Sequence, residues 1–252
     1  MRFIRFIHEG MERFGLIEGE QVVPLSGRPW EAISPCGQAV PLAGLPLLAP
    51  VCPSKIVAVG RNYREHAAEL GNPVPTSPII FIKPSTAVIG PEGTIIYPPE
   101  TKNLHHESEL AVVIGKRAHR IAPQDVAAHI WGYTCANDVT ARDLQRSDEQ
   151  WTRAKGFDTF APLGPWVETE LDPGAVEVIC RVNGQVRQDG HTQDMVFDVA
   201  ALVAFIANAM TLLPGDVVLT GTPEGVGPLQ PGDRVEVEIQ GIGVLRNSVG
   251  LA

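Results

Sequence analysis

Glycine and proline divide this chain into short apolar runs. These frequent breaks constrain the fold more than any other feature of the sequence. The 252 residues include 25 glycines and 22 prolines, a composition that favours turns and short strands over long helices. Strand-like runs such as 55–60, 78–84 and 109–114 outnumber the helical patterns and do not alternate regularly with them. We therefore expect an α+β, β-rich fold with mixed, mostly antiparallel sheets and a few helices.

The first part of the chain differs in pattern from the rest. Residues 1–6 and 15–25 alternate apolar and polar side chains and predict strands. The proline- and glycine-rich stretch 35–53 is typical of a linker. We expect a small N-terminal β-rich segment with its linker over residues 1–50, and one catalytic domain over residues 51–252.

Four further local patterns predict regular structure. Residues 61–71 have helical composition and end at a glycine, and residues 197–210 carry apolar side chains at helical spacing. Residues 122–134 indicate a helix that leads into a strand. Asn183 and Gly184 predict the tight turn of a hairpin.

Composition excludes several classes of partner. The formal net charge is −9, which argues against nucleic acid because neutralising phosphates needs a basic patch. No stretch approaches the roughly 18 apolar residues that span a bilayer, so no membrane segment is expected. The four cysteines show no CxxC spacing, and we expect reduced thiols in a cytoplasmic protein.

Two acidic residues stand where a strand enters the core. Glu107 and Glu109 point to the same face of a strand, and residues 110–114 are apolar on both faces. Two like charges that lose hydration need a compensating cation. Asp138 follows another apolar segment, although spacing alone does not link it to the glutamates. An oxygen-only set favours Mg²⁺ or Mn²⁺ over zinc; the alternative is an acidic edge strand that faces solvent.

His66 and Glu69 lie three residues apart in the helical segment and can touch on one helix face. A carboxylate beside an imidazole orients the ring and suits a general base. The alternative is a solvated helix surface, on which such pairs are common.

Several other residues have weaker signals. Lys155 lies beside aromatic residues and, if partly buried, could stabilise a developing enolate charge; a surface lysine is the alternative. Lys83 ends an apolar strand and could face a cleft. The glycine-rich segment 220–227 can present backbone N–H groups to an anion but lacks a P-loop signature. His105 and His106 are expected behind the carboxylates or in packing.

Together these stretches resemble the fumarylacetoacetate hydrolase superfamily, specifically its small acylpyruvase-like branch. The matching segments run in family order and are GRNYREHAAE (60–69), FIKPSTAV (81–88), NLHHESELAVVIGK (103–116), NDVTARDLQ (137–145), RAKGFDTFAPLGP (153–165), VNGQVRQDG (182–190) and LTGTPEGVG (219–227). Two departures stand out. The large members have a longer N-terminal domain and an additional upstream carboxylate ligand with no clear counterpart here. Residues 145–160 are closer to bacterial 2-hydroxyhepta-2,4-dienedioate isomerases.

The resemblance implies a mixed β-sandwich roll, usually assembled as a homodimer or larger oligomer. It implies one Mg²⁺ or Mn²⁺ on Glu107, Glu109 and Asp138, and a catalytic His66–Glu69 dyad on a short helix that orders over the substrate. It also implies substrate contacts from Lys155, Gln145 and Thr222, to which we add Lys83 as a predicted substrate contact and Lys155 as a catalytic residue.

The expected activity is metal-dependent hydrolytic cleavage of a C–C bond in an acylpyruvate-type 2-oxo acid. Isomerisation of a 2-hydroxyhepta-2,4-diene-1,7-dioate, or decarboxylation or tautomerisation of oxaloacetate, would use the same enolate chemistry. A non-catalytic binding protein on the same fold is the contrasting class, and a nucleotide-binding protein is a further, weaker alternative.

Overall fold

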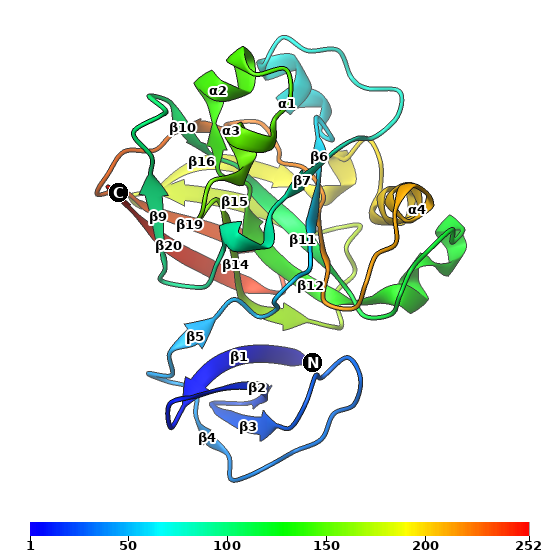
Figure 1. Cartoon of the computed structure of the whole chain (residues 1–252), viewed down its shortest axis with the longest axis vertical. Coiled ribbons are helices and arrows are strands. Elements are labelled where there is room, and N and C mark those ends of the chain that lie inside the picture. The colour runs from blue at the N-terminus through cyan, green and yellow to red at the C-terminus, as the bar shows by residue number, and fades with distance from the viewer. Residues whose placement is uncertain (252) are drawn as a thin grey trace.

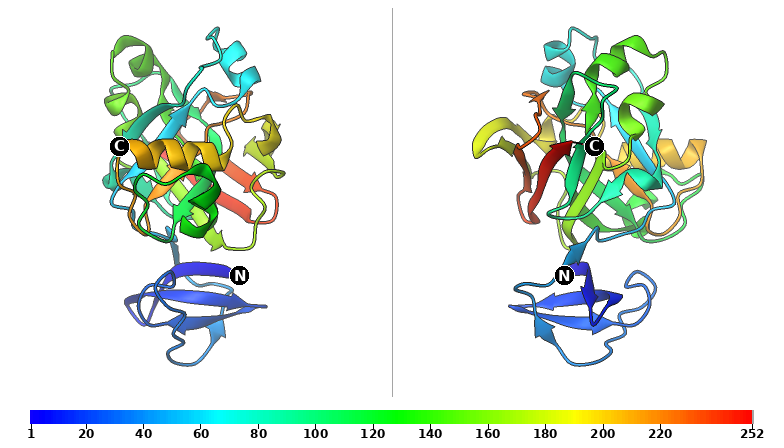
Figure 2. Two further views of the ribbon diagram at one scale, coloured as in Figure 1. Left: turned by 90° about the vertical axis from the view of Figure 1, so that its right-hand side faces the viewer. Right: turned by 60° about the vertical axis from the view of Figure 1, so that its left-hand side comes forward.

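The computed structural model describes residues 1–251, in which a small N-terminal β unit adjoins a larger body of strands and short helices (Figure 1). The unit contains β1 (Arg2–His8), β2 (Met11–Glu18), β3 (Gln21–Leu25), β4 (Val40–Pro41) and β5 (Leu47–Leu48). Ile4, Phe6 and Val22 form a core of its own. The stretch expected as a linker thus contributes two short strands. Figure 2 shows this unit at one end of the molecule.

The body is built on a long sheet that the N-terminal strands join, because β1 pairs with β14. Its spatial order is β4-β3-β2-β1-β14-β12-β11-β17-β6-β7, with β8 paired to β14. The strands from the body are β6 (Ile56–Gly60), β7 (Ile79–Lys83), β8 (Val88–Ile89), β11 (Ser108–Ile114), β12 (Ile130–Asn137), β14 (Ala161–Glu168) and β17 (Val217–Leu219). Most neighbours are antiparallel, while β6 and β17 are parallel. Every residue of β11 is buried, which explains its continuous apolar run.

A second sheet packs on the first. It has the order β16-β15-β19-β20-β9 and consists of β9 (Thr94–Tyr97), β15 (Glu177–Val182), β16 (Gln185–His191), β19 (Arg234–Ile239) and β20 (Gly243–Leu251). Leu110 and Val112 of β11 meet Val178 and Val237 of this sheet in the main core. Two packed, mostly antiparallel sheets confirm the predicted β-rich sandwich. A small third sheet holds β10 (Leu104–His106), β13 (Thr140–Ala141) and β18 (Gly227–Pro228).

Helices are few and short. They are α1 (Arg64–Glu69), α2 (Arg142–Ser147), α3 (Thr152–Gly156) and α4 (Val199–Ala209), with single 3₁₀ segments η1 (Ser85–Ala87), η2 (Pro123–His129) and η3 (Thr192–Asp194). Two of the three predicted helices are confirmed as α1 and α4, whereas the helix expected before β12 is the 3₁₀ segment η2. The hairpin is also confirmed, with φ of 53° and 76° at Asn183 and Gly184. Between residues 1 and 251, no helix has the length and apolarity needed to cross a membrane.

Asp216 joins the starts of β6 and β17, the parallel pair beside the site described below. Its fully buried carboxylate accepts hydrogen bonds from Ser54 Oγ (2.6 Å) and Leu213 N (2.8 Å) and forms an ion pair with Lys55. Asp216→Ala would leave these donors unsatisfied, so we expect the free energy of unfolding to fall by about 3 kcal/mol. Urea denaturation measures this, with the exposed Asp125→Ala as control. A loss no larger than that of the control would contradict this assignment.

Candidate active site

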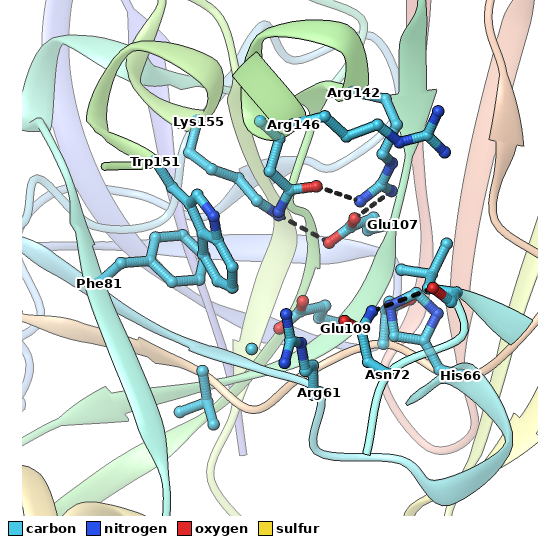
Figure 3. A pocket seen from close by; sticks show the side chains of 15 residues that line it. Arg61, His66, Asn72, Phe81, Glu107, Glu109, Arg142, Arg146, Trp151 and Lys155 are labelled. Atoms are coloured by element: carbon cyan, nitrogen blue, oxygen red, sulfur yellow. Dashed lines mark hydrogen bonds and ion pairs between the residues drawn. The ribbon is translucent and has the colours of Figure 1, made fainter. Parts of the chain in front are cut away.

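A cavity of about 290 Å³ opens where the ends of β6, β7 and β11 meet helices α2 and α3 (Figure 3). It is lined by Val59, Gly60, Arg61, His66, Leu70, Asn72, Phe81, Glu107, Glu109, Arg142, Gln145, Arg146, Trp151, Lys155 and Thr222. The lining therefore includes six of the residues predicted from sequence, from five separate segments. A cavity of this size suits a small organic acid.

The pairing of β11 with β12 brings the three predicted carboxylates together. Ser108 lies opposite Asn137 in this antiparallel pair, so Glu107 just before β11 and Asp138 just after β12 reach the same edge. The N–H of Asp138 donates to the carbonyl oxygen of Glu107 at 2.8 Å. One carboxylate oxygen from each of Glu107, Glu109 and Asp138 lies within 4.8 Å of the others, and all three side chains are buried. The pairing of β11 with β12 therefore brings Asp138 beside the two glutamates, which spacing in the sequence could not predict.

Glu107 is held between two cations. Its Oε2 accepts from Lys155 Nζ at 2.8 Å, and its Oε1 forms an ion pair with Arg142. Burial alone would raise the pKa of Glu107, but the positive charges of Lys155 and Arg142 outweigh burial and hold that pKa well below its usual value. Glu107 is therefore ionised at neutral pH.

Two buried lysines contact Asp138 from different sides. Lys155 Nζ donates to Oδ2 at 2.6 Å, and Lys83 forms an ion pair with Oδ1. Burial lowers the pKa of Lys155, but the carboxylates of Asp138 and Glu107 outweigh it and raise the pKa above its usual value. Lys155 lines the cavity as a cation. Lys83 is fully buried, lies outside the lining and also donates to the carbonyl of Val139 at 3.2 Å, so this geometry gives its predicted substrate contact no support.

Glu109 lacks the cation that the other two carboxylates have. Its Oε2 accepts from the N–H of Gly221 at 2.6 Å, and no Lys, Arg or His among residues 1–251 forms an ion pair with it. Burial and the negative charges of Asp138 and Glu107 raise the pKa of Glu109 well above its usual value. Two oxygens at about 2.0–2.1 Å from one ion lie at most about 4.2 Å apart, so the three carboxylates, whose oxygens are within 4.8 Å of one another, need at most a small side-chain shift to share an ion. The three residues therefore fit a hard divalent cation such as Mg²⁺ or Mn²⁺.

The His66–Glu69 pair forms on α1. His66 Nδ1 lies 3.3 Å from Glu69 Oε2, and Glu69 Oε1 accepts from the N–H of Gly225 at 3.1 Å. With Nδ1–H donating to Glu69, Nε2 is left as a proton acceptor. Burial lowers the pKa of His66 below 6.5, an effect that the charges of Glu107 and Glu69 only partly offset. His66 can therefore act as a neutral base at pH 7.

Thr222 and Gln145 line the same cavity and are held in place. Thr222 Oγ1 donates to the carbonyl of Ser108 at 2.8 Å and accepts from Gln188 Nε2 at 2.7 Å. Gln145 Oε1 accepts from Arg142 at 2.6 Å, which leaves its amide N–H groups as donors. His106, predicted behind the carboxylates, contacts Gln188 Oε1 at 3.0 Å and thus lies behind Thr222.

Several lining residues were not among those predicted from the sequence. Arg142 lies within the matching segment 137–145, and its spacing of three residues from Gln145 is the pattern that could have revealed their contact on α2. Phe81 and Trp151 form an edge-to-face pair with ring centroids 5.4 Å apart. Lys155 Nζ lies 5.0 Å from the centre of the Phe81 ring. The aromatic wall joins segments 70 residues apart, which no local pattern could reveal.

Comparison with known families places most of the chain in one of them. The family described as fumarylacetoacetate (FAA) hydrolase C-terminal matches residues 55–250. A second, described as Rv2993c-like, N-terminal, matches residues 1–50. The first range contains every residue that we predicted for the site.

Similar proteins, between 31% and 46% identical to this chain, carry different activities in their names. Oxaloacetate tautomerase FAHD2A, mitochondrial, from Bos taurus is 46% identical over 83% of this chain and 71% of its own length. The crystal structure of 5-carboxymethyl-2-hydroxymuconate delta-isomerase from Mycobacterium smegmatis is 46% identical, with a TM-score of 0.94 over 100% of both chains. Maleylpyruvate hydrolase from Sphingobium sp. SYK-6, solved with manganese(II) and pyruvate, is 31% identical, with a TM-score of 0.82 over 100% of both chains.

Proposed function

Because the chain belongs to the fumarylacetoacetate hydrolase family, we propose that it is a divalent-metal-dependent tautomerase that interconverts the enol and keto forms of a small 2-oxo acid. Oxaloacetate is the first substrate to test, since a tautomerase of that acid is 46% identical to this chain. This activity replaces C–C hydrolysis as the leading hypothesis, because the compared hydrolase is 31% identical.

One observation carries the proposal: a neutral, buried base and a buried cation line the same cavity as two of the three clustered carboxylates. His66 supplies the base and Lys155 the cation. Tautomerisation requires only that a proton move between the C2 oxygen and C3 of the acid. No second nucleophile or cofactor is needed to balance the reaction.

The residues of this chain account for each requirement of that proton transfer. His66 Nε2 accepts the proton of the enol hydroxyl and delivers a proton to C3, so that C2 becomes a carbonyl. Glu69, held by the N–H of Gly225, keeps the ring oriented and stabilises the transient imidazolium. Lys155, a cation in the cavity lining, would stabilise the negative charge that collects on the C2 oxygen. A divalent cation held by Glu107, Glu109 and Asp138 would supply Lewis-acid stabilisation of the same charge.

Hydrolysis of an acylpyruvate-type acid is the second candidate, and the anchored dyad is equally suited to it. A histidine fixed by a carboxylate that is itself hydrogen-bonded can deprotonate a water molecule as readily as an enol. The hydroxide would add to the distal carbonyl, and the C–C bond would break to release a carboxylic acid and a 2-oxo acid in its enol form. The similarity to maleylpyruvate hydrolase supports this alternative.

A substrate panel separates these activities. The purified protein would be assayed with Mg²⁺ or Mn²⁺ for loss of the oxaloacetate enol absorbance, for acylpyruvate cleavage and for isomerisation of a 2-hydroxy-dienedioate. We expect acceleration of oxaloacetate tautomerisation with the highest kcat/KM. Acylpyruvate cleavage with no tautomerisation would replace the first proposal with the second. No turnover of any member would favour a binding protein on this fold.

The pH dependence of turnover follows from the state of His66. Burial lowers its pKa below 6.5, so the base is neutral at pH 7 and becomes protonated only at lower pH. We expect kcat/KM to stay level near pH 7 and to fall about tenfold per unit on an acid limb centred below 6.5. Glu69→Gln removes a charge that raises this pKa, and should move the limb to still lower pH. A limb centred above 6.5 would contradict the assignment.

A further inference from the structure

Four cationic side chains line the cavity, and they differ in how they are paired. Arg142 and Lys155 are bound to Glu107. Arg61 and Arg146 form no ion pair with any acidic residue between positions 1 and 251. Arg146 is exposed, whereas Arg61 is half-buried, and Figure 3 shows the Arg61 guanidinium pointing toward the space above Glu109. Arg61 is therefore the cation in this cavity that is both partly sheltered and available to an anion.

The backbone holds Arg61 in an unusual conformation. Its φ is 59°, in the left-handed region that side chains other than glycine seldom adopt. The next residue, Asn62, fixes this turn: its Nδ2 donates to the carbonyls of Thr220 (2.7 Å) and Phe197 (3.0 Å), and its Oδ1 accepts from Phe197 N at 2.9 Å. Strain maintained by surrounding contacts is typical of residues with a functional role. Here it directs Arg61 into the cavity.

An apolar wall adjoins the arginine in the cavity lining. Trp151 packs edge-to-face on Phe81, and it lies so close to Gly60 that a Cβ added there would come within 2.8 Å of the indole ring. Gly60 thus permits the ring to cover the strand next to Arg61. Such a wall suits the short carbon chain of a ligand with an anionic group at each end.

We propose that Arg61 is the specificity-determining residue that binds the distal carboxylate of a dicarboxylic 2-oxo acid. This inference rests on the proposed function, which places the 2-oxo acid end beside Glu107, Glu109 and Lys155. A guanidinium and a carboxylate form two parallel charge-assisted hydrogen bonds, whose contribution is greatest in a partly desolvated site. The preference for two carboxylates over one therefore depends on Arg61.

Matched ligand pairs test this without requiring turnover. 2-Oxoglutarate and 2-oxobutyrate share the 2-oxo acid end, and only 2-oxoglutarate has a distal carboxylate. Calorimetric titration of the Mn²⁺-loaded protein should show tighter binding of 2-oxoglutarate. In Arg61→Met its affinity should fall about 10- to 100-fold, while that of 2-oxobutyrate changes less than threefold. Arg61→Lys, which keeps the charge without the planar fork, should retain part of the preference.

Two further variants serve as controls for backbone strain and for the loss of a positive charge outside the cavity. Arg61→Gly removes the guanidinium and accepts a positive φ without strain, so it should reproduce the Arg61→Met result in a well-folded protein. Arg64→Met removes an exposed arginine outside the cavity lining and should change neither affinity. An unchanged preference in Arg61→Gly, or no preference in the unmodified protein, would overturn the proposal. Failure of the proposed function would appear separately, as absent tautomerase turnover in the unmodified protein.

Discussion

Replacing His66 by alanine is expected to lower kcat for enol–keto interconversion by about 10²- to 10⁴-fold while divalent metal binding stays nearly unchanged. The imidazole is the only neutral base among the lining residues that the structure describes, and it does not belong to the carboxylate cluster. Removing it deletes the proton acceptor and leaves the cation site intact. Stopped-flow assays of kcat and calorimetric titration with Mn²⁺ measure the two effects independently.

The control for this substitution lies on the same helix. Glu65→Ala changes an exposed neighbour that does not line the cavity, and should leave kcat within about twofold of the unmodified protein. Unaltered turnover in His66→Ala would remove His66 from the mechanism. It would also favour an account in which Lys155 and the cluster act without a base.

The second large effect concerns Glu109, whose substitution should separate stability from metal binding. Glu109→Gln keeps an oxygen that can accept the N–H of Gly221 and removes a buried charge that has no cationic partner between residues 1 and 251. We expect affinity for Mn²⁺ to fall at least about 100-fold. Without metal, the free energy of unfolding at neutral pH should rise by about 1–3 kcal/mol, because ionising this carboxylate opposes folding.

The sign of that stability change follows from the shifted pKa. Burial and the charges of Asp138 and Glu107 raise the pKa of Glu109 above 4.5 in the folded state. Its contribution therefore becomes unfavourable as the pH rises from the unfolded pKa through the folded one. Urea denaturation of both proteins after chelation tests this. A less stable metal-free variant with unaltered Mn²⁺ affinity would show that Glu109 is structural.

The fold class could be predicted because it follows from local sequence patterns that indicate strands and helices. Short apolar runs between glycines and prolines indicated strands, and the spacing of apolar side chains over residues 197–210 indicated a helix. The structure adds its cap, because the Asp198 side chain accepts from the N–H of Ala201. Residues 122–129 were harder, because a 3₁₀ segment and an α-helix share much of their local pattern. The homodimer, the division at residue 50 and the individual roles of the site residues stay predictions.

Only part of the site could be predicted from the sequence, because some of its residues meet only through contacts between distant segments. The two-residue spacing of Glu107 and Glu109 predicted that both point to one face of a strand and could share a cation; the structure places Glu107 just before β11, with both carboxylates in the cluster. Asp138 and Lys155 reach them through strand pairing and helix placement, which depend on contacts between distant segments. Only the family resemblance linked them beforehand. Lys83 was predicted to contact substrate because it is a charge at a strand end. In the structure it is fully buried and forms an ion pair with Asp138.

The most direct test of the account is turnover of oxaloacetate as a function of bound metal. Protein stripped of divalent ions with a chelator would be titrated with Mn²⁺ while the tautomerisation rate and bound metal are recorded. The carboxylate cluster predicts a rate near the uncatalysed one without metal, and full recovery when one ion per chain is bound. Undiminished catalysis by the metal-free protein would contradict the claim that Glu107, Glu109 and Asp138 hold the ion on which the reaction depends.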